Sequence, residues 1–75
     1  MAFEDTVFTS GTLTITTYSE TEAVWVANLL AAMEVAPKKS IHTYLKTRTS
    51  NPLEQTILLV LGFVEEEDNK FIYYF

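Results

Sequence analysis

Few residue types in this chain could perform covalent chemistry, and their spacing does not assemble a reactive site. The chain has 75 residues, no cysteine, one histidine (His42) and two aspartates (Asp5 and Asp68). Nucleophilic catalysis requires a nucleophile, a base and an orienting group. A structural zinc site requires about four cysteine or histidine ligands. The two glycines are also too far apart to form a phosphate-binding loop. We therefore expect no catalytic site, no cofactor and no bound metal ion.

The sharpest chemical feature is a run of four acids, Glu65, Glu66, Glu67 and Asp68. It lacks the alternating ligands and the central glycine of a calcium loop. The run could be a solvated turn, or it could dock on a basic protein. Two more acids, Glu4 and Asp5, occur near the start of the chain. The functional hypothesis takes all six of these acids as protein-binding residues.

Charge is segregated along the chain. Ten acidic residues outnumber five basic ones, which gives a net charge of −5. Residues 1–34 carry acids and no base, residues 35–49 carry bases and no acid, and residues 50–75 carry acids and Lys70. Summed charge steers molecular encounters over about 10 Å. The whole chain is therefore expected to repel nucleic acid and to attract basic partners.

The basic segment, residues 38–48, has two interpretations. As a strand, residues 40–48 place four side chains on one face: His42, Tyr44, Lys46 and Arg48. Such a face resembles a nucleic-acid surface, because bases stack on aromatic rings and cations neutralise phosphate. As a helix over 38–47, the segment would join helices at 20–34 and 51–61 in a layout that resembles a winged-helix domain. Helix 51–61 would then be the recognition helix, yet it carries Glu54 and no base.

The chain is expected to begin with a hairpin followed by a helix. Residues 12–18 alternate threonine with Leu13 and Ile15, as a half-buried strand does. A turn at Ser10–Gly11 would let residues 3–8 pair with this strand. A helix is predicted over 20–34, with its apolar face formed by Val26, Leu29, Leu30 and Met33.

The boundaries of that helix are predicted from local signals. Ser19 and Glu22 have the spacing of a capping box at its start. Pro37 is expected to end it, because proline cannot donate to the helical ladder and restrains the preceding residue.

A second helix is predicted over 52–61. Asn51 supplies a capping side chain, Pro52 stands at the first helical position and Glu54 follows. The alternative is a buried central strand, because residues 56–64 form a continuous apolar run. Residues 63–66 and 70–75 then flank an acidic turn. The predicted fold is α+β: one domain over 1–75, with helix 20–34 and a second helix 52–61 on an antiparallel sheet that ends in a C-terminal hairpin.

Size and surface patterning predict a homodimer. A domain of this length draws only about 3–5 kcal/mol of net stability from a single core, and disulfides are impossible without cysteine. The back of helix 20–34 carries small, uncharged residues, and the chain ends in aromatic residues. The predicted dimer interface consists of Val24, Asn28, Ala31, Ala32, Tyr73 and Phe75.

The start of the chain is acidic where a secretory signal would be basic, and the apolar run 57–64 is far shorter than the roughly 20 residues that span a bilayer. We therefore expect no membrane association and a cytoplasmic location. In its small size, acidity, and lack of cysteine and catalytic residues, the chain resembles small acidic phage-encoded host-inhibitor proteins, some of which imitate the charge of DNA.

That resemblance implies a viral, non-enzymatic protein that binds and inhibits or regulates a basic, nucleic-acid-binding protein. Two alternatives remain open. One is a nucleic-acid-binding regulator that uses residues 38–48, and the other is a structural or assembly subunit.

Overall fold

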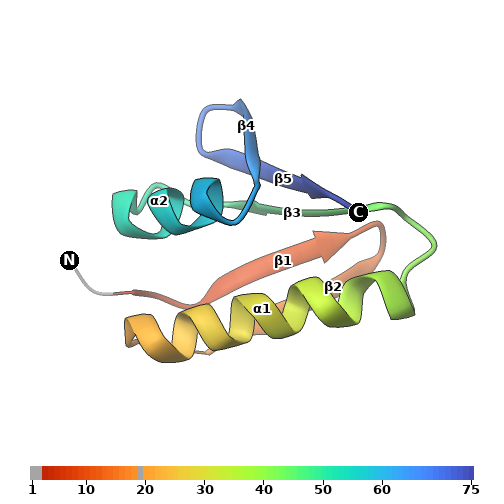
Figure 1. The fold of residues 1–75 in the computed structure, drawn as a ribbon, viewed down its shortest axis with the longest axis horizontal. Helices are drawn as coiled ribbons and strands as arrows, with labels where there is room; N and C mark the ends of the chain where they lie inside the picture. Colours follow the sequence, from red (N-terminus) through yellow and green to blue (C-terminus); the bar gives the residue numbers. More distant parts are fainter. Residues whose placement is uncertain (1–2, 19) are drawn as a thin grey trace.

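The computed structural model describes residues 3–18 and 20–75, which form a five-stranded antiparallel sheet and two helices (Figure 1). In chain order the elements are β1 (Thr6–Ser10), β2 (Leu13–Thr17), α1 (Glu22–Lys39), β3 (Tyr44–Arg48), α2 (Pro52–Val60), β4 (Val64–Glu67) and β5 (Lys70–Tyr74). The strand order is β2-β1-β3-β5-β4. This is the α+β architecture that the sequence predicts, with the second helix and the C-terminal hairpin in place.

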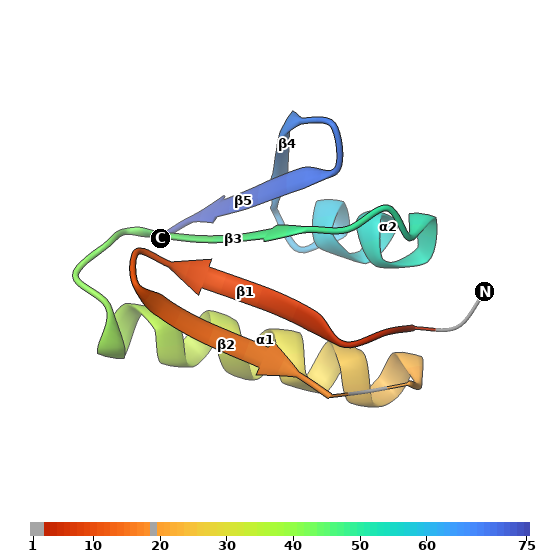
Figure 2. The ribbon, with the colours of Figure 1, turned by 180° about the vertical axis from the view of Figure 1, so that it is seen from behind.

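Both helices pack on one face of the sheet, and the other face is open. Figures 1 and 2 show α1 lying along β1 and β2, while α2 covers the other half of the sheet. The core between the layers is made of buried side chains from both helices and from alternate strand positions: Phe8, Trp25, Leu29, Leu45, Leu58 and Phe71. Each such side chain stabilises the fold by roughly 1.5–3 kcal/mol on burial. The intervening strand positions are left facing solvent or one another.

The predicted N-terminal hairpin is confirmed, with its first strand at Thr6–Ser10 rather than 3–8. The turn needs Gly11, whose φ of +62° is disfavoured for other residues. A Cβ at Gly11 would also lie 2.0 Å from the Cδ2 atom of His42. Thr17 ends β2 against Thr6, whose backbone N–H donates to the Thr17 hydroxyl at 3.2 Å.

Helix α1 is longer than predicted. It begins at Glu22, with Thr21 as the N-cap residue whose hydroxyl accepts from the Val24 N–H at 3.4 Å. The predicted capping residue, Ser19, lies outside the described residues. The expectation that Pro37 ends the helix is wrong, because α1 continues to Lys39. The last turn is held by the fully buried Ala36, whose carbonyl accepts from the Ser40 N–H at 2.9 Å.

The buried face of α1 is also rotated from the predicted one. Its buried positions are Trp25, Leu29, Ala32 and Ala36. Leu30, assigned to the apolar face from its spacing, is 48% exposed. The alanines let the helix approach the sheet closely, and Trp25 fills the remaining space beside Phe3 and Phe8.

The ambiguous segment is a strand. Residues Tyr44–Arg48 form β3 at the centre of the sheet, between β1 and β5. The winged-helix layout, which needs a helix there, is therefore wrong. Strand β5 lies between β3 and β4, so the aromatic C-terminal residues are held inside the protein's own sheet. Within residues 3–18 and 20–75, no helix is long and apolar enough to cross a membrane.

Candidate functional site

The N-terminal acids and the hairpin acids converge around Arg48. Its Nη2 lies 3.7 Å from a carboxylate oxygen of Glu67, and its Nη1 donates to the Asp68 carbonyl at 3.3 Å. On the other side, Arg48 shares the lining of a polar cavity of about 240 Å³ with Glu4 and Asp5. Residues 3–5, which precede β1, and the β4–β5 turn accordingly lie toward the same end of the molecule (Figure 1). We call this region the acidic end; it comprises Glu4, Asp5, Arg48, Glu54, Glu65, Glu66, Glu67, Asp68 and Lys70.

The hairpin acids are exposed, and Glu65 and Glu66 make local contacts in addition to the contacts of Glu67 and Asp68 with Arg48. A Glu65 carboxylate oxygen accepts from the Asn69 N–H at 3.1 Å, which supports the positive φ of Asn69 in the turn. Glu66 accepts a hydrogen bond from the Tyr74 hydroxyl. That hydrogen bond, with smaller effects from desolvation and the Glu66 charge, raises the pKa of Tyr74 above its usual 10.0. The tip is therefore an ordered array of carboxylates rather than a loose tail.

Glu54 is a carboxylate of a different kind, because it is 2% exposed. It accepts hydrogen bonds from the Thr49 hydroxyl at 2.7 Å and from the Glu4 N–H at 3.1 Å. The Thr6 hydroxyl and the Asn51 side-chain amide lie farther away, at 3.4 and 3.5 Å. Glu54 thus ties α2 to the N-terminal segment and holds Glu4 at the cavity that Arg48 also lines. Its spacing after Asn51 marks it in the sequence as a capping residue but gives no sign of this burial.

The open face of the sheet carries a small basic patch. Arg48 of β3 is paired with Lys70 of β5, and Lys46 lies on the same face. Lys46 Nζ is 5.7 Å from the centre of the Tyr44 ring. A cavity of about 270 Å³ follows this patch toward Val7 and Thr9 of β1 (residues Val7, Thr9, Lys46, Thr47, Arg48 and Lys70 line it). Tyr44, Lys46 and Arg48 therefore share a face, as the strand interpretation predicts.

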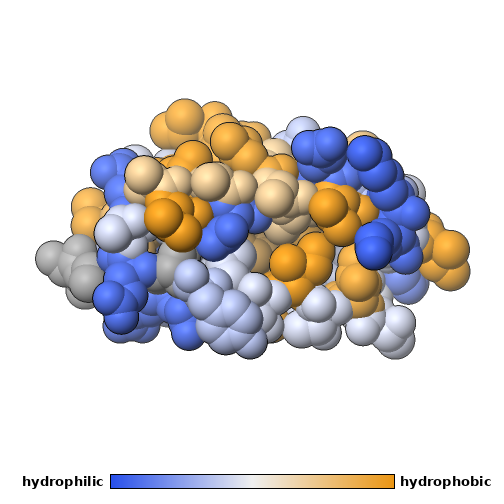
Figure 3. Space-filling view, turned by 90° about the horizontal axis from the view of Figure 1, so that it is seen from below, coloured by the Kyte–Doolittle hydropathy of each residue, from blue (hydrophilic) through white to orange (hydrophobic). Residues whose placement is uncertain are grey.

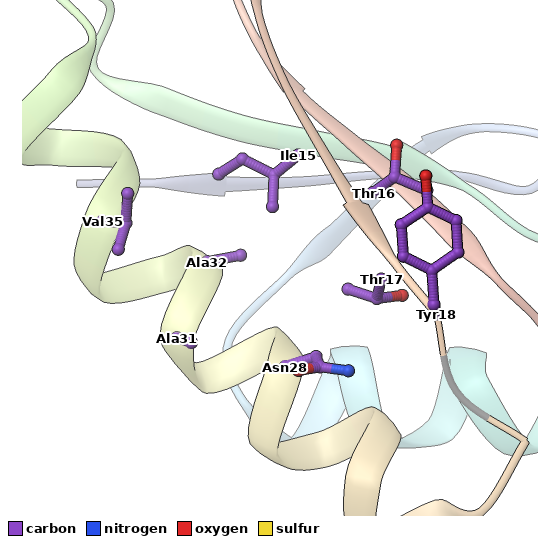
Figure 4. Close-up of a pocket in the computed structure, with 8 residues that line it drawn as sticks. All are labelled: Ile15, Thr16, Thr17, Tyr18, Asn28, Ala31, Ala32 and Val35. Carbon is purple, nitrogen blue, oxygen red and sulfur yellow. The ribbon is translucent and has the colours of Figure 1, made fainter.

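A groove of about 340 Å³ lies between α1 and the edge strand β2 (Figure 4). Its walls are Ile15, Thr16, Thr17 and Tyr18 from the strand and Asn28, Ala31, Ala32 and Val35 from the helix. Seen from the α1 side, hydrophobic side chains run along the middle of this face, with hydrophilic groups gathered mainly toward its ends (Figure 3). None of the eight residues carries a formal charge.

The predicted dimer residues fall in two separate places. Asn28 and Ala31 line the groove, and Ala32, which is 2% exposed, forms part of its floor. Val24 lies on the same helix and is 47% exposed. Tyr73 instead packs on Phe63 and on Phe75, on β5 at the far half of the sheet.

Nothing in the described part of the chain groups three or more His, Asp or Glu residues in a way that could hold a metal ion. Comparison with protein-family models, with curated proteins and with solved structures gives no match for this chain.

Proposed function

We propose that this protein is a non-enzymatic interaction protein that binds a basic, nucleic-acid-binding protein through its acidic end, and so inhibits or regulates it. The observation that carries the proposal is the convergence of Glu4 and Asp5 with Glu67 and Asp68 on the two sides of Arg48. The acidic end holds seven acids against two bases, so its formal charge equals the −5 of the whole chain.

Such a surface acts mainly on the encounter with a partner. Charged rims set the association rate and its salt dependence more than they set the final affinity. The Arg48–Glu67 pair is exposed and therefore contributes little to stability, so cations of a partner can compete for the same carboxylate. Glu54 and Asn69 hold the two acidic segments in place, which reduces the entropy that binding must remove.

The proposal places the protein in the cytoplasm as a homodimer, in keeping with its likeness in character to phage-encoded inhibitors. The partner class follows from charge: proteins that bind nucleic acid carry basic surfaces, and an ordered set of carboxylates competes for such surfaces.

Removing the hairpin charges tests the proposal. The variant carries Glu65→Gln, Glu66→Gln, Glu67→Gln and Asp68→Asn. We expect it to fold, and to bind the captured basic partner with slower association and a flatter dependence on salt. DNA should compete with the wild-type protein for that partner.

The matched control is Glu34→Gln, which removes an exposed acid of α1 outside the acidic end. This control should bind the partner at close to the wild-type rate. Equal binding by the acidic-end variant and the wild-type protein, at low and high salt, would show that the acidic end is not the docking surface.

A second candidate function uses the open face of the sheet. Arg48 and Lys70 are direct cross-strand partners, and Lys46 lies beside Tyr44. Three cations and an aromatic ring on adjacent strands suit a single-stranded nucleic acid. Fluorescence anisotropy with a single-stranded oligonucleotide at low salt should then detect binding that Lys46→Gln with Lys70→Gln abolishes. Binding of this kind, together with no effect of the acidic-end substitutions, would favour this second function over the first.

A further inference from the structure

The two edges of the sheet differ in a way that selects one of them for pairing. Edge strand β4 reads Val-Glu-Glu-Glu and has a register shift between Glu65 and Glu67. Adjacent charges and bulges prevent edge strands from pairing with other chains. Edge strand β2 reads Leu-Thr-Ile-Thr-Thr, has an unbroken register with β1, and contains neither charge nor proline. Strand β2 is therefore the edge that remains open to another strand.

We infer that two copies of this chain join through their β2 strands and α1 helices, and that the groove beside β2 is the centre of this interface. The two β2 strands run antiparallel, which makes one continuous sheet with all helices on one face. The groove of each copy is thus covered by β2 and α1 of the second copy. This inference rests on the homodimer of the proposed function, for which it gives the interface, and it does not require that the acidic end bind a basic partner.

The backbone of β2 supports this pairing and fixes its register. In a hairpin closed by two residues, the pair next to the turn is hydrogen-bonded, and hydrogen-bonded and open pairs then alternate. Ser10 and Leu13 form the pair next to the turn. Because of this alternation, the N–H and C=O groups of Thr14 and Thr16 point away from β1, toward the open edge of the sheet. A two-fold axis at Ile15 places Thr14 opposite Thr16 of the second copy, so the outward groups of both strands meet.

Helix α1 presents a matching seam above the strand. Val24, Asn28, Ala31 and Val35 repeat at spacings of four, three and four residues, the spacing of a helix–helix seam. Asn28, Ala31 and Val35 line the groove together with Ile15 (Figure 4). Because Ala31 lies near the middle of α1, the axis at Ile15 brings the two helices together at their centres. Small side chains there allow helix axes to approach to about 8–10 Å.

Charge complementarity identifies a second copy as the occupant. The segment that leads from β2 into α1 carries Glu20, and the last turn of α1 carries Lys39 beside Lys38, which pairs with Glu34 of its own helix. An antiparallel helix pair puts the acidic start of each helix beside the basic end of the other. A two-fold partner therefore satisfies both ends of the groove at once. The acidic end around Arg48 is on other elements and remains available to a basic partner.

Sedimentation velocity of the purified full-length chain tests the inference. Wild type should sediment with twice the 8.5 kDa chain mass. Thr16→Pro removes an outward N–H while sparing the bonds to β1, and Ala31→Glu places two carboxylates against each other at the axis. Both variants should be monomeric and folded by circular dichroism. Thr16→Val keeps the N–H, and Ala23→Glu places the same charge on the exposed side of α1 that faces away from the sheet and from the seam; both should remain dimeric.

A charge exchange identifies the partner as a second copy even if a β2 variant fails to fold. Glu20→Lys alone and Lys39→Glu alone should each weaken the dimer by roughly tenfold, because each creates two like-charge contacts by symmetry. The double variant Glu20→Lys/Lys39→Glu should recover wild-type association. A wild-type monomer at high micromolar concentration overturns the inference. A dimer that Thr16→Pro, Ala31→Glu and the single charge reversals all leave intact also overturns it.

Discussion

Glu54 should contribute more to stability than any exposed acid of this chain. Its carboxylate is 2% exposed and accepts from the Thr49 hydroxyl at 2.7 Å and the Glu4 N–H at 3.1 Å. A buried donor left without an acceptor costs about 1–3 kcal/mol. Glu54→Ala removes the acceptor of these two part-buried donors, which gives an upper range of roughly 2–6 kcal/mol. The adjoining polar cavity of about 240 Å³ can admit water to them, so we expect a loss in the lower half of that range.

This loss is large for a chain of 75 residues. Domains are stabilised by roughly 0.05–0.15 kcal/mol per residue, or about 4–11 kcal/mol here. Glu54→Gln keeps the shape and one acceptor oxygen, so it should lose about 1–2 kcal/mol. Urea unfolding measures both variants, and the midpoint should fall while the slope stays constant.

The matched control is Glu34→Gln, since the Glu34 side chain is 73% exposed and pairs with Lys38 at 3.4 Å. That substitution should change the free energy of unfolding by less than about 0.5 kcal/mol. Equal midpoints for the Glu54 and Glu34 variants would refute the reasoning. If the network also positions Glu4, then Glu54→Gln should slow association with a basic partner although it leaves every hairpin acid in place.

Three further predictions concern the hairpins. Tyr74 should titrate above its usual 10.0 in a tyrosinate absorbance titration, and Glu66→Gln should lower its pKa. The pKa of Tyr74 is higher in the folded state than in the unfolded state. Its contribution to stability is therefore present below the unfolded-state pKa and is lost as the pH rises through the folded-state pKa. A urea midpoint that rises between these two pKa values would contradict this prediction. Phe71→Ala should lower stability by about 3–5 kcal/mol in urea, because Phe71 is 1% exposed, and a change below about 1 kcal/mol would show that its site collapses. Gly11→Ala should lower the thermal midpoint for two reasons: its Cβ would lie 2.0 Å from the His42 ring, and the backbone at this position has a φ of +62°. Adding His42→Ala should relieve the clash with the ring but not the strain in the backbone.

Local sequence signals predict the elements whose causes are local. The alternation around Leu13 and Ile15 gives β2, and Asn51-Pro52 gives the start of α2. The end of α1 is predicted wrongly because its cause is tertiary. Pro37 disfavours the last turn, but the burial of Ala36 against the sheet and its bond from Ser40 keep that turn helical. The strand β3 is undecided in sequence because pairing with β1 and β5 determines it.

The candidate site is predictable in composition but not in arrangement. The sequence shows that Glu65–Asp68 are acidic and flank a turn. It does not show that Arg48 meets them, because that contact depends on the register in which Arg48 pairs with Lys70. The proximity of Glu4 depends in turn on the buried carboxylate of Glu54, which lies 50 residues away in sequence. Long-range register and burial have no signature in a local window.

The segregation of charge along the chain becomes an asymmetry of the folded sheet. The acids of β4 protect one edge from pairing and also belong to the docking surface that we propose for the acidic end. The opposite edge, β2, has no such protection and lies beside an uncharged groove. A small domain with one blocked edge and one open edge has two distinct surfaces for association. The open edge suits pairing with an identical chain. The blocked edge pairs with no further strand, so its carboxylates remain accessible to a partner of opposite charge.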